Sequence, residues 1–199
     1  MLALIVFLCS LLLPAIHGAI AGGNLKAGTN ALLGLMDYAR QSAGTRNLKV
    51  ELRLYQDTTR PTDPNGESPY RLAALAIPAA SSGTSADQFL TTPVILPGDV
   101  VIDSSLAFST VLNPHLGGAG LQPQAETEAV GAPLAIHNLP YIKITYLANG
   151  TIALDPSQKW CLTLVNEAQE RPGSGTTPAP DFATLILDPT TSKARLFEP

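Results

Sequence analysis

Residues 48–55 read LKVELRLY, and in this stretch Leu48, Val50, Leu52 and Leu54 alternate with charged or aromatic side chains. A two-residue period places these four apolar residues on one face of an extended strand. The pattern predicts a β-strand with one face buried and the other in water, which is typical of antiparallel sheets.

Strand-like segments recur from this stretch to the C-terminus. Asn149 and Gly150 lie between two of them and predict a tight hairpin, because both central residues of a type I′ turn need positive φ. Helices do not alternate with these segments, which argues against a parallel doubly wound sheet. We therefore expect a mostly β fold, an antiparallel β-sandwich or jelly-roll-like domain, with a partly open β-barrel as the alternative. The expected strands cover residues 70–77, 94–96, 100–102, 106–112, 141–148, 151–154, 159–165, 182–187 and 194–197.

One helix is expected before the strands, within residues 22–44. Asn30 is a suitable N-terminal cap, and Gly44 is a suitable C-terminal stop. The apolar face of this helix is predicted from residues at helical spacing: Leu32, Leu35, Met36 and Ala39.

The first residues have the pattern of a secretory signal. Residues 2–13 are apolar apart from Ser10, and small residues follow Pro14. This pattern predicts cleavage after Ala21 and a single secreted, extracellular domain over residues 22–199. The alternative is an uncleaved membrane anchor, which needs about 20 apolar residues.

Composition excludes some partner classes and a disulfide-stapled fold. Charged residues make up 14% of the chain, the formal net charge is −4, and no basic run is present. Nucleic acid and anionic membrane surfaces are therefore not expected as partners. After cleavage Cys161 is left without a second cysteine, so we expect either a buried thiol or a disulfide to a second chain.

No catalytic motif stands out, and we assign no catalytic residue, metal ligand or cofactor. The G-x-S-x-G, H-E-x-x-H, C-x-x-C, G-x-G-x-x-G and P-loop patterns are absent. His115, His137 and Asp103 are the groups that a hydrolase would use, and a secreted hydrolase is kept as an alternative.

Two groups of oxygen ligands could suggest a metal site, but the sequence favours neither. The oxygen-rich turn from Asp57 to Glu67 lacks the spacing of an EF-hand loop. Asp99 and Asp103 would stand about 13 Å apart on one strand, which is too far for a shared ion.

Two further features bear on the surface. Asn149-Gly150-Thr151 is a sequon, so Asn149 is a candidate N-glycosylation site in a secretory host. Tyr55 and Tyr141 are candidates for stacking on sugars, whereas Trp160 is expected in the core.

The sequence thus favours a secreted, non-catalytic and effector-like β-domain that binds a polysaccharide, a surface protein or a small ligand outside the cell. Its contacts would come from three long loops, at residues 78–93, 113–133 and 168–181. A structural surface protein that dimerises through Cys161 or a sheet edge is a further alternative.

Overall fold

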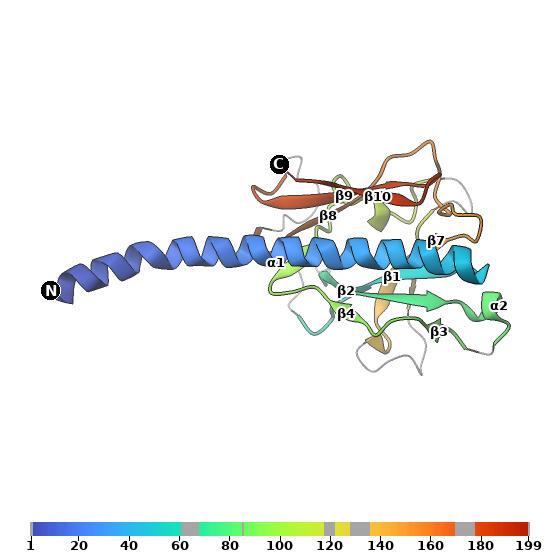
Figure 1. Ribbon diagram of the computed structural model, residues 1–199, viewed down its shortest axis with the longest axis horizontal. Helices are drawn as coiled ribbons and strands as arrows, with labels where there is room; N and C mark the ends of the chain where they lie inside the picture. The colour runs from blue at the N-terminus through green and yellow to red at the C-terminus, as the bar shows by residue number, and fades with distance from the viewer. Residues whose placement is uncertain are drawn as a thin grey trace.

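The computed structural model describes residues 2–60, 68–84, 86–117, 122–127, 136–169 and 178–198. One long N-terminal helix precedes a mostly antiparallel sheet (Figure 1). The helices and strands are α1 (Leu2–Arg46), β1 (Val50–Gln56), β2 (Tyr70–Ile77), α2 (Ala79–Ser82), β3 (Gln88–Phe89), β4 (Val94–Ile95), β5 (Val100–Ile102), η1 (Thr110–Leu112), β6 (Gln124–Thr127), β7 (Pro140–Tyr146), β8 (Trp160–Asn166), η3 (Glu167–Gln169), β9 (Phe182–Asp188) and β10 (Lys193–Phe197).

The ten strands form one sheet in the order β10-β9-β8-β5-β2-β1-β7-β6, and the short strands β3 and β4 also pair with β2. Every strand pair is antiparallel. The sheet does not close, so β10 and β6 are its two edges. This confirms the expected antiparallel, sandwich-like β fold with one N-terminal helix, and the sheet is not closed into a barrel.

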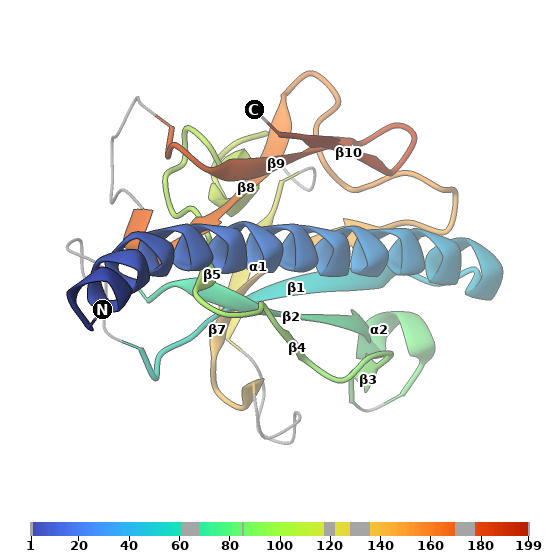
Figure 2. The ribbon, with the colours of Figure 1, turned by 60° about the vertical axis from the view of Figure 1, so that its left-hand side comes forward.

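The C-terminal half of α1 covers one face of the sheet. Figures 1 and 2 show the helix running between the β8–β10 part of the sheet and the β1–β2 part. The predicted apolar face is confirmed, because its four members are all buried in the main core with Leu52, Leu54 and Trp160. The predicted members are Leu32, Leu35, Met36 and Ala39.

The ends of the helix differ from those expected. Asn30 is exposed in the middle of α1, so its assignment as a cap is wrong. Gly44 does not end the helix either: α1 continues to Arg46, and Asn47 takes the left-handed conformation with φ 53°. Asn tolerates this conformation better than most residues, which explains why the chain turns there.

The first strand is buried on both faces. The apolar side is buried as predicted and packs against α1, but Glu51, Arg53 and Tyr55 on the opposite side are buried as well. The expectation of one wet face is therefore wrong. A second small core that contains Tyr55, Leu72 and Ile136 covers this side.

Smaller corrections concern five segments that were expected as strands, loops or a type I′ turn. Residues 106–112 contain the 3-10 helix η1, and residues 151–154 contribute only the bridge between Ile152 and Tyr146. The strands β3 and β6 lie in segments expected as loops. The turn after β7 has positive φ only at Gly150, so it is not a type I′ turn.

Candidate functional site

The first candidate site is the part of α1 that is not packed on the sheet. Figure 1 shows the helix extending well beyond the rest of the molecule toward the N-terminus. At Gly28 an added Cβ would lie 3.2 Å from the Val100 side chain, so the helix touches the sheet closely there. At Gly18, Gly22 and Gly23 the same atom would meet nothing within 4 Å. Leu25 is the first described side chain of α1 that packs against the main core, so the helix leaves the domain close to Leu25.

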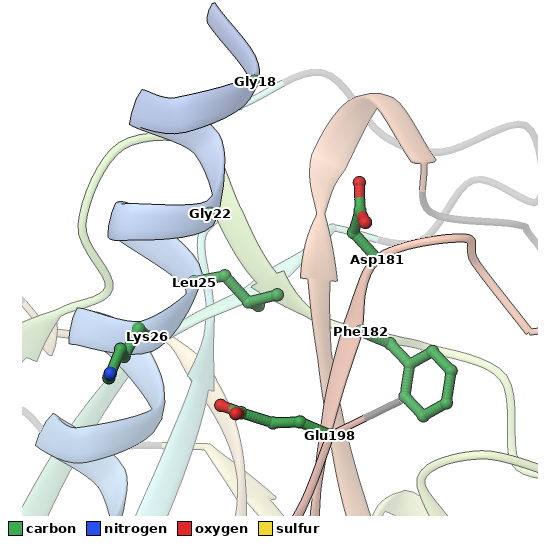
Figure 3. Close-up of a pocket in the computed structure, with 7 residues that line it drawn as sticks. All are labelled: Gly18, Gly22, Leu25, Lys26, Asp181, Phe182 and Glu198. Atoms are coloured by element: carbon green, nitrogen blue, oxygen red, sulfur yellow. The ribbon is translucent and has the colours of Figure 1, made fainter.

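A hollow of about 280 Å³ marks the point of departure (Figure 3). Leu25 points from α1 toward strand β9, and Glu198 points from the C-terminal end of β10 toward the helix. The lining residues are Gly18, Gly22, Leu25, Lys26, Asp181, Phe182 and Glu198. The hollow combines two acidic side chains and one lysine with apolar walls.

The second candidate is a buried ionic cluster on the sheet face away from α1. The Arg53 guanidinium donates hydrogen bonds to Glu51 at 2.6 Å and to Asp87 at 2.5 Å. It also lies over the rings of Tyr141 at 4.9 Å and Phe89 at 5.7 Å, within the range of cation–π attraction. Burial lowers the pKa of Arg53, but the bond to Asp87 and the charge of Glu51 outweigh this effect, so the pKa is raised overall.

Lys143 on β7 extends this cluster toward the sheet edge. Its ammonium group lies 3.4 Å from Glu51 and 2.6 Å from Glu126. The Tyr141 hydroxyl donates to Glu126 at 2.8 Å. Burial raises the pKa of Glu126, whereas Lys143 and Tyr141 lower it, and the net shift is downward. The two cations and three carboxylates of the cluster pair with one another and join strands β1, β6 and β7.

The third candidate lies where three chain segments meet at one end of the sheet. The Arg60 guanidinium forms ion pairs with Asp57 at 3.8 Å, with Asp99 at 3.5 Å, and with Glu167. Arg71 lies close by, and its guanidinium donates to the carbonyl groups of Leu96, Gly98 and Val100. An adjoining hollow of about 370 Å³ is lined by Asp99, Asn166, Glu167 and Ala168.

The ion pairs of Arg60 involve carboxylates of both metal sites considered in the sequence, Asp57 and Asp99. The Asp57 carboxylate forms an ion pair with Arg60. It also accepts hydrogen bonds from the amide and the hydroxyl of Thr59. Residues 61–67 of the predicted turn lie outside the described residues. Within residues 2–60 and the other described ranges, no three His, Cys, Asp or Glu side chains are grouped to hold a metal ion.

The three hydrolase candidates lie on different parts of the fold. Asp103 follows β5, whereas His137 precedes β7. These two strands are three positions apart in the sheet, which corresponds to about 14 Å at 4.8 Å between neighbouring strands. His115 is exposed after η1. Asp103 is buried and accepts the amide of Ser105 at 2.8 Å, and its burial raises its pKa. No described hydrogen bond or ion pair joins Asp103 to either histidine.

Cys161 and Trp160 occupy opposite faces of β8. Trp160 is in the main core and donates its indole N–H to the Asp155 carbonyl at 2.8 Å. The Cys161 thiol is half-buried and lies 3.3 Å from the Phe108 carbonyl. No disulfide joins it to another described residue.

The two tyrosines considered for sugar stacking are not on the surface. Tyr55 and Tyr141 are 0% and 4% exposed, and their ring centroids lie 5.2 Å apart. The prediction is wrong because the second face of β1 is covered. The alternation of Glu51 and Arg53 with leucines gave no signal for burial, since isolated charged residues are rarely buried.

Asn149 is exposed at the tip of the turn that follows β7. Its side-chain carbonyl accepts the Thr151 amide at 3.2 Å and the Thr151 hydroxyl at 2.8 Å. The amide of Leu147 donates to the Thr151 carbonyl, which closes the turn. The sequon is therefore accessible, and its glycosylation stays a prediction.

The fold defines a mostly antiparallel β-domain with a long N-terminal helix. No known protein family matches this sequence, and no curated protein matches it. Among solved structures, it is similar to the minor pseudopilin EpsH from the type 2 secretion system of Vibrio cholerae. The identity is 11%, the TM-score is 0.47, and the match covers 88% of this chain and 98% of that chain.

In the described residues, no helix combines the length and the hydropathy that a bilayer span requires.

Proposed function

We propose that this chain is an exported, non-catalytic subunit of a cell-surface assembly, and that the N-terminal half of α1 holds it there by packing against apolar helices of neighbouring subunits. The observation that carries the proposal is the continuity of α1. The helix has 45 residues, about 68 Å at 1.5 Å per residue, and only its C-terminal part is packed on the sheet.

The composition of the projecting part supports a protein partner of this kind. The first charged residue in the chain is Lys26, and residues 2–13 are apolar apart from Ser10. An apolar helix without tertiary contacts is unfavourable in water, because helices are stabilised mainly by packing of an apolar face. Gly18 and Gly22 are four residues apart, and such spacing lets a second helix approach closely.

The rest of the molecule supports binding over catalysis. The candidate catalytic groups are spread over separate elements, and the charged side chains of the second and third candidate sites are paired with one another. A protein partner is favoured over a polysaccharide, since Tyr55, Tyr141 and Trp160 are buried and offer no ring face to a sugar. The proposal also implies that the residues before Ala21 are retained, in place of the cleavage expected from the sequence.

A crosslinking experiment tests the proposal. Ile20 is 57% exposed on α1, so Ile20→Cys in a chain carrying Cys9→Ala and Cys161→Ala presents one thiol on the projecting helix. Treatment of producing cells with a short bis-maleimide should then give adducts with other proteins. Gln158→Cys in the same background is the control, because Gln158 is exposed on the domain far from α1 in sequence.

Equal adducts at both positions, or none at Ile20→Cys, would contradict the proposal. If Ile20→Cys gives no adduct while the chain is released from membranes only by detergent, lipid rather than protein holds the helix, and the proposal is wrong.

A further inference from the structure

The outer edge of β10 is an unpaired strand edge at the end of the sheet. β10 pairs with β9 on one side, and no described residue pairs with its other side. Alternate backbone N–H and C=O groups of an edge strand point outward and are free to pair with another chain. This edge lies in the globular part, so an inference from it goes beyond the role proposed for α1.

The two faces of β10 have different chemistry. Lys193, Arg195 and Phe197 lie opposite Asp188, Ile186 and Thr184 of β9, on the sheet face away from α1. Ala194 and Leu196 lie opposite Leu187 and Leu185, which are buried against α1. The outer face of β10 therefore carries two cations and one aromatic ring, and the helix side is apolar.

Apolar surface is exposed on both sides of this edge. Phe197 is 53% exposed, and its ring centroid lies 6.2 Å from that of Phe182. Ile186 is 47% exposed on the same face, and Leu196 is 40% exposed on the helix side. A strand added beside β10 would cover these side chains.

The two cations at this edge lack ion-pair partners within the described chain. Asp188 lies opposite Lys193, but its carboxylate accepts the Thr190 amide at 3.0 Å and the Thr191 hydroxyl at 2.7 Å. Arg195 adds to the lowering of the pKa of Asp188 but forms no ion pair with it. Glu198 points to the helix side, into the hollow beside α1 (Figure 3).

The opposite edge of the sheet lacks this chemistry. β6 carries Glu126, which forms an ion pair with Lys143 and accepts a hydrogen bond from Tyr141. A second copy that paired its own β10 with this β10 would bring Lys193 and Arg195 close to their own copies, which is unfavourable. The occupant that fits is an acidic strand from a different protein.

We propose that β10 binds an extended segment of a partner protein in which acidic and apolar side chains alternate. The segment adds to the sheet as a further strand, with backbone hydrogen bonds to β10. Its acidic side chains lie over Lys193 and Arg195, and its apolar side chains lie beside Leu196 on the helix side.

Binding of synthetic peptides to the full chain tests the inference. The probe is a fluorescent peptide in which glutamate and valine alternate, and the charge control has lysine in place of glutamate. Two further versions of this peptide carry backbone N-methyl groups on alternate residues. One is methylated at every glutamate, and the other at every valine. Since only one set of amides faces β10, one N-methylated peptide should lose binding and the other should retain it.

The glutamate peptide should bind at least tenfold more tightly than the lysine peptide. The double variant Lys193→Glu/Arg195→Glu should reverse this preference. Arg46→Glu/Lys49→Glu changes two exposed cations at the junction of α1 and β1 and should alter affinity less than twofold.

Three results would each overturn the inference. They are the absence of binding by the glutamate peptide, equal affinity for both charge types, and equal binding by the two N-methylated peptides. Light scattering on the free chain adds a fourth: a dimer that Lys193→Glu/Arg195→Glu abolishes would assign the edge to a second copy.

Discussion

Arg53 and Asp87 are 34 positions apart in the sequence, and the Arg53 guanidinium donates a 2.5 Å hydrogen bond to the Asp87 carboxylate. Asp87 also accepts the amide of Ala79 at 2.8 Å, at the start of α2. The pair therefore fastens the segment after β2 to the buried face of β1. Arg53 is almost fully buried, so its charge depends on Glu51 and Asp87 for compensation.

Arg53→Ala should lower the free energy of unfolding by about 3 kcal/mol, because it leaves the half-buried Asp87 without an ion-pair partner and the buried Glu51 with Lys143 alone. Urea unfolding at neutral pH measures the effect. Arg40→Ala is the matched control, since Arg40 forms a half-exposed pair with Asp37 at 3.7 Å and should cost about 1 kcal/mol or less. Equal losses in the two variants would show that the cluster around Arg53 is not a stabilising element.

The stability of the domain should fall as the pH is lowered through the acid range. Burial raises the pKa of Asp87, but the Ala79 amide and Arg53 lower it more, so its folded pKa lies below its usual value. A carboxyl with a lowered folded pKa stabilises the protein above its unfolded pKa, near 3.9, and this contribution is lost as the pH falls through the folded pKa.

Asp87→Asn isolates this contribution. At pH 7 the variant should lose about 1.5–3 kcal/mol of stability, the usual range for a hydrogen bond to a charged group. Near pH 2 the difference from the parent chain should shrink. A difference that stays constant between pH 7 and pH 2 would exclude ionisation of Asp87 as its source.

Asp103 should behave in the opposite way. Burial raises its pKa in the folded state, so the folded protein holds this proton more tightly than the unfolded chain does. Ionisation above the unfolded pKa therefore costs stability. Asp103→Asn should raise the melting temperature at pH 7 and leave it unchanged near pH 3. A lower melting temperature at both pH values would contradict this account.

Two glycines of α1 form a matched pair for testing how the helix meets the sheet. An added Cβ at Gly34 would meet nothing within 4 Å, so Gly34→Ala should stabilise the domain by about 0.5–1 kcal/mol through helix propensity. At Gly28 the Cβ would lie 3.2 Å from Val100 and 3.4 Å from Pro97, so Gly28→Ala should gain less or lose stability. Equal gains at both positions would mean that α1 is not closely packed at Gly28.

Export of the chain through a eukaryotic secretory pathway should give a glycan at Asn149. The turn exposes the Asn149 side chain beside Thr151, as a modifying enzyme requires. Thr151→Val removes the sequon but keeps the shape of the residue, and should abolish the mass increment. An unmodified parent chain after secretion would contradict the assignment.

The apolar periods of the sequence predicted most of the strands and the packed face of α1, because burial of one face is a local property. Leu52 and Leu54 in β1 and Leu32 and Met36 in α1 are examples. Other features depend on contacts between distant segments. Arg53 and Glu51 resemble an exposed strand face, and their burial requires Asp87 and Lys143, which come from other parts of the chain.

The helix shows a different limit. Local sequence patterns separate an apolar export signal from a domain helix at Ala21, because the residues before and after Ala21 match different local patterns. The structure joins both halves in one helix, and no helix end lies at Ala21 or at Asn30. The edge at β10 was also beyond prediction, because strand order is set by pairing between distant segments.

The most direct measurement is mass spectrometry of the chain isolated from the surface of producing cells. Lys26 is the first trypsin site in the sequence, so the N-terminal tryptic peptide ends there. If α1 holds the chain in an assembly, this peptide extends back through Gly18 into the apolar residues 2–13. A peptide that begins at Gly22 would contradict the central claim, because the segment proposed to bind neighbouring helices would have been removed.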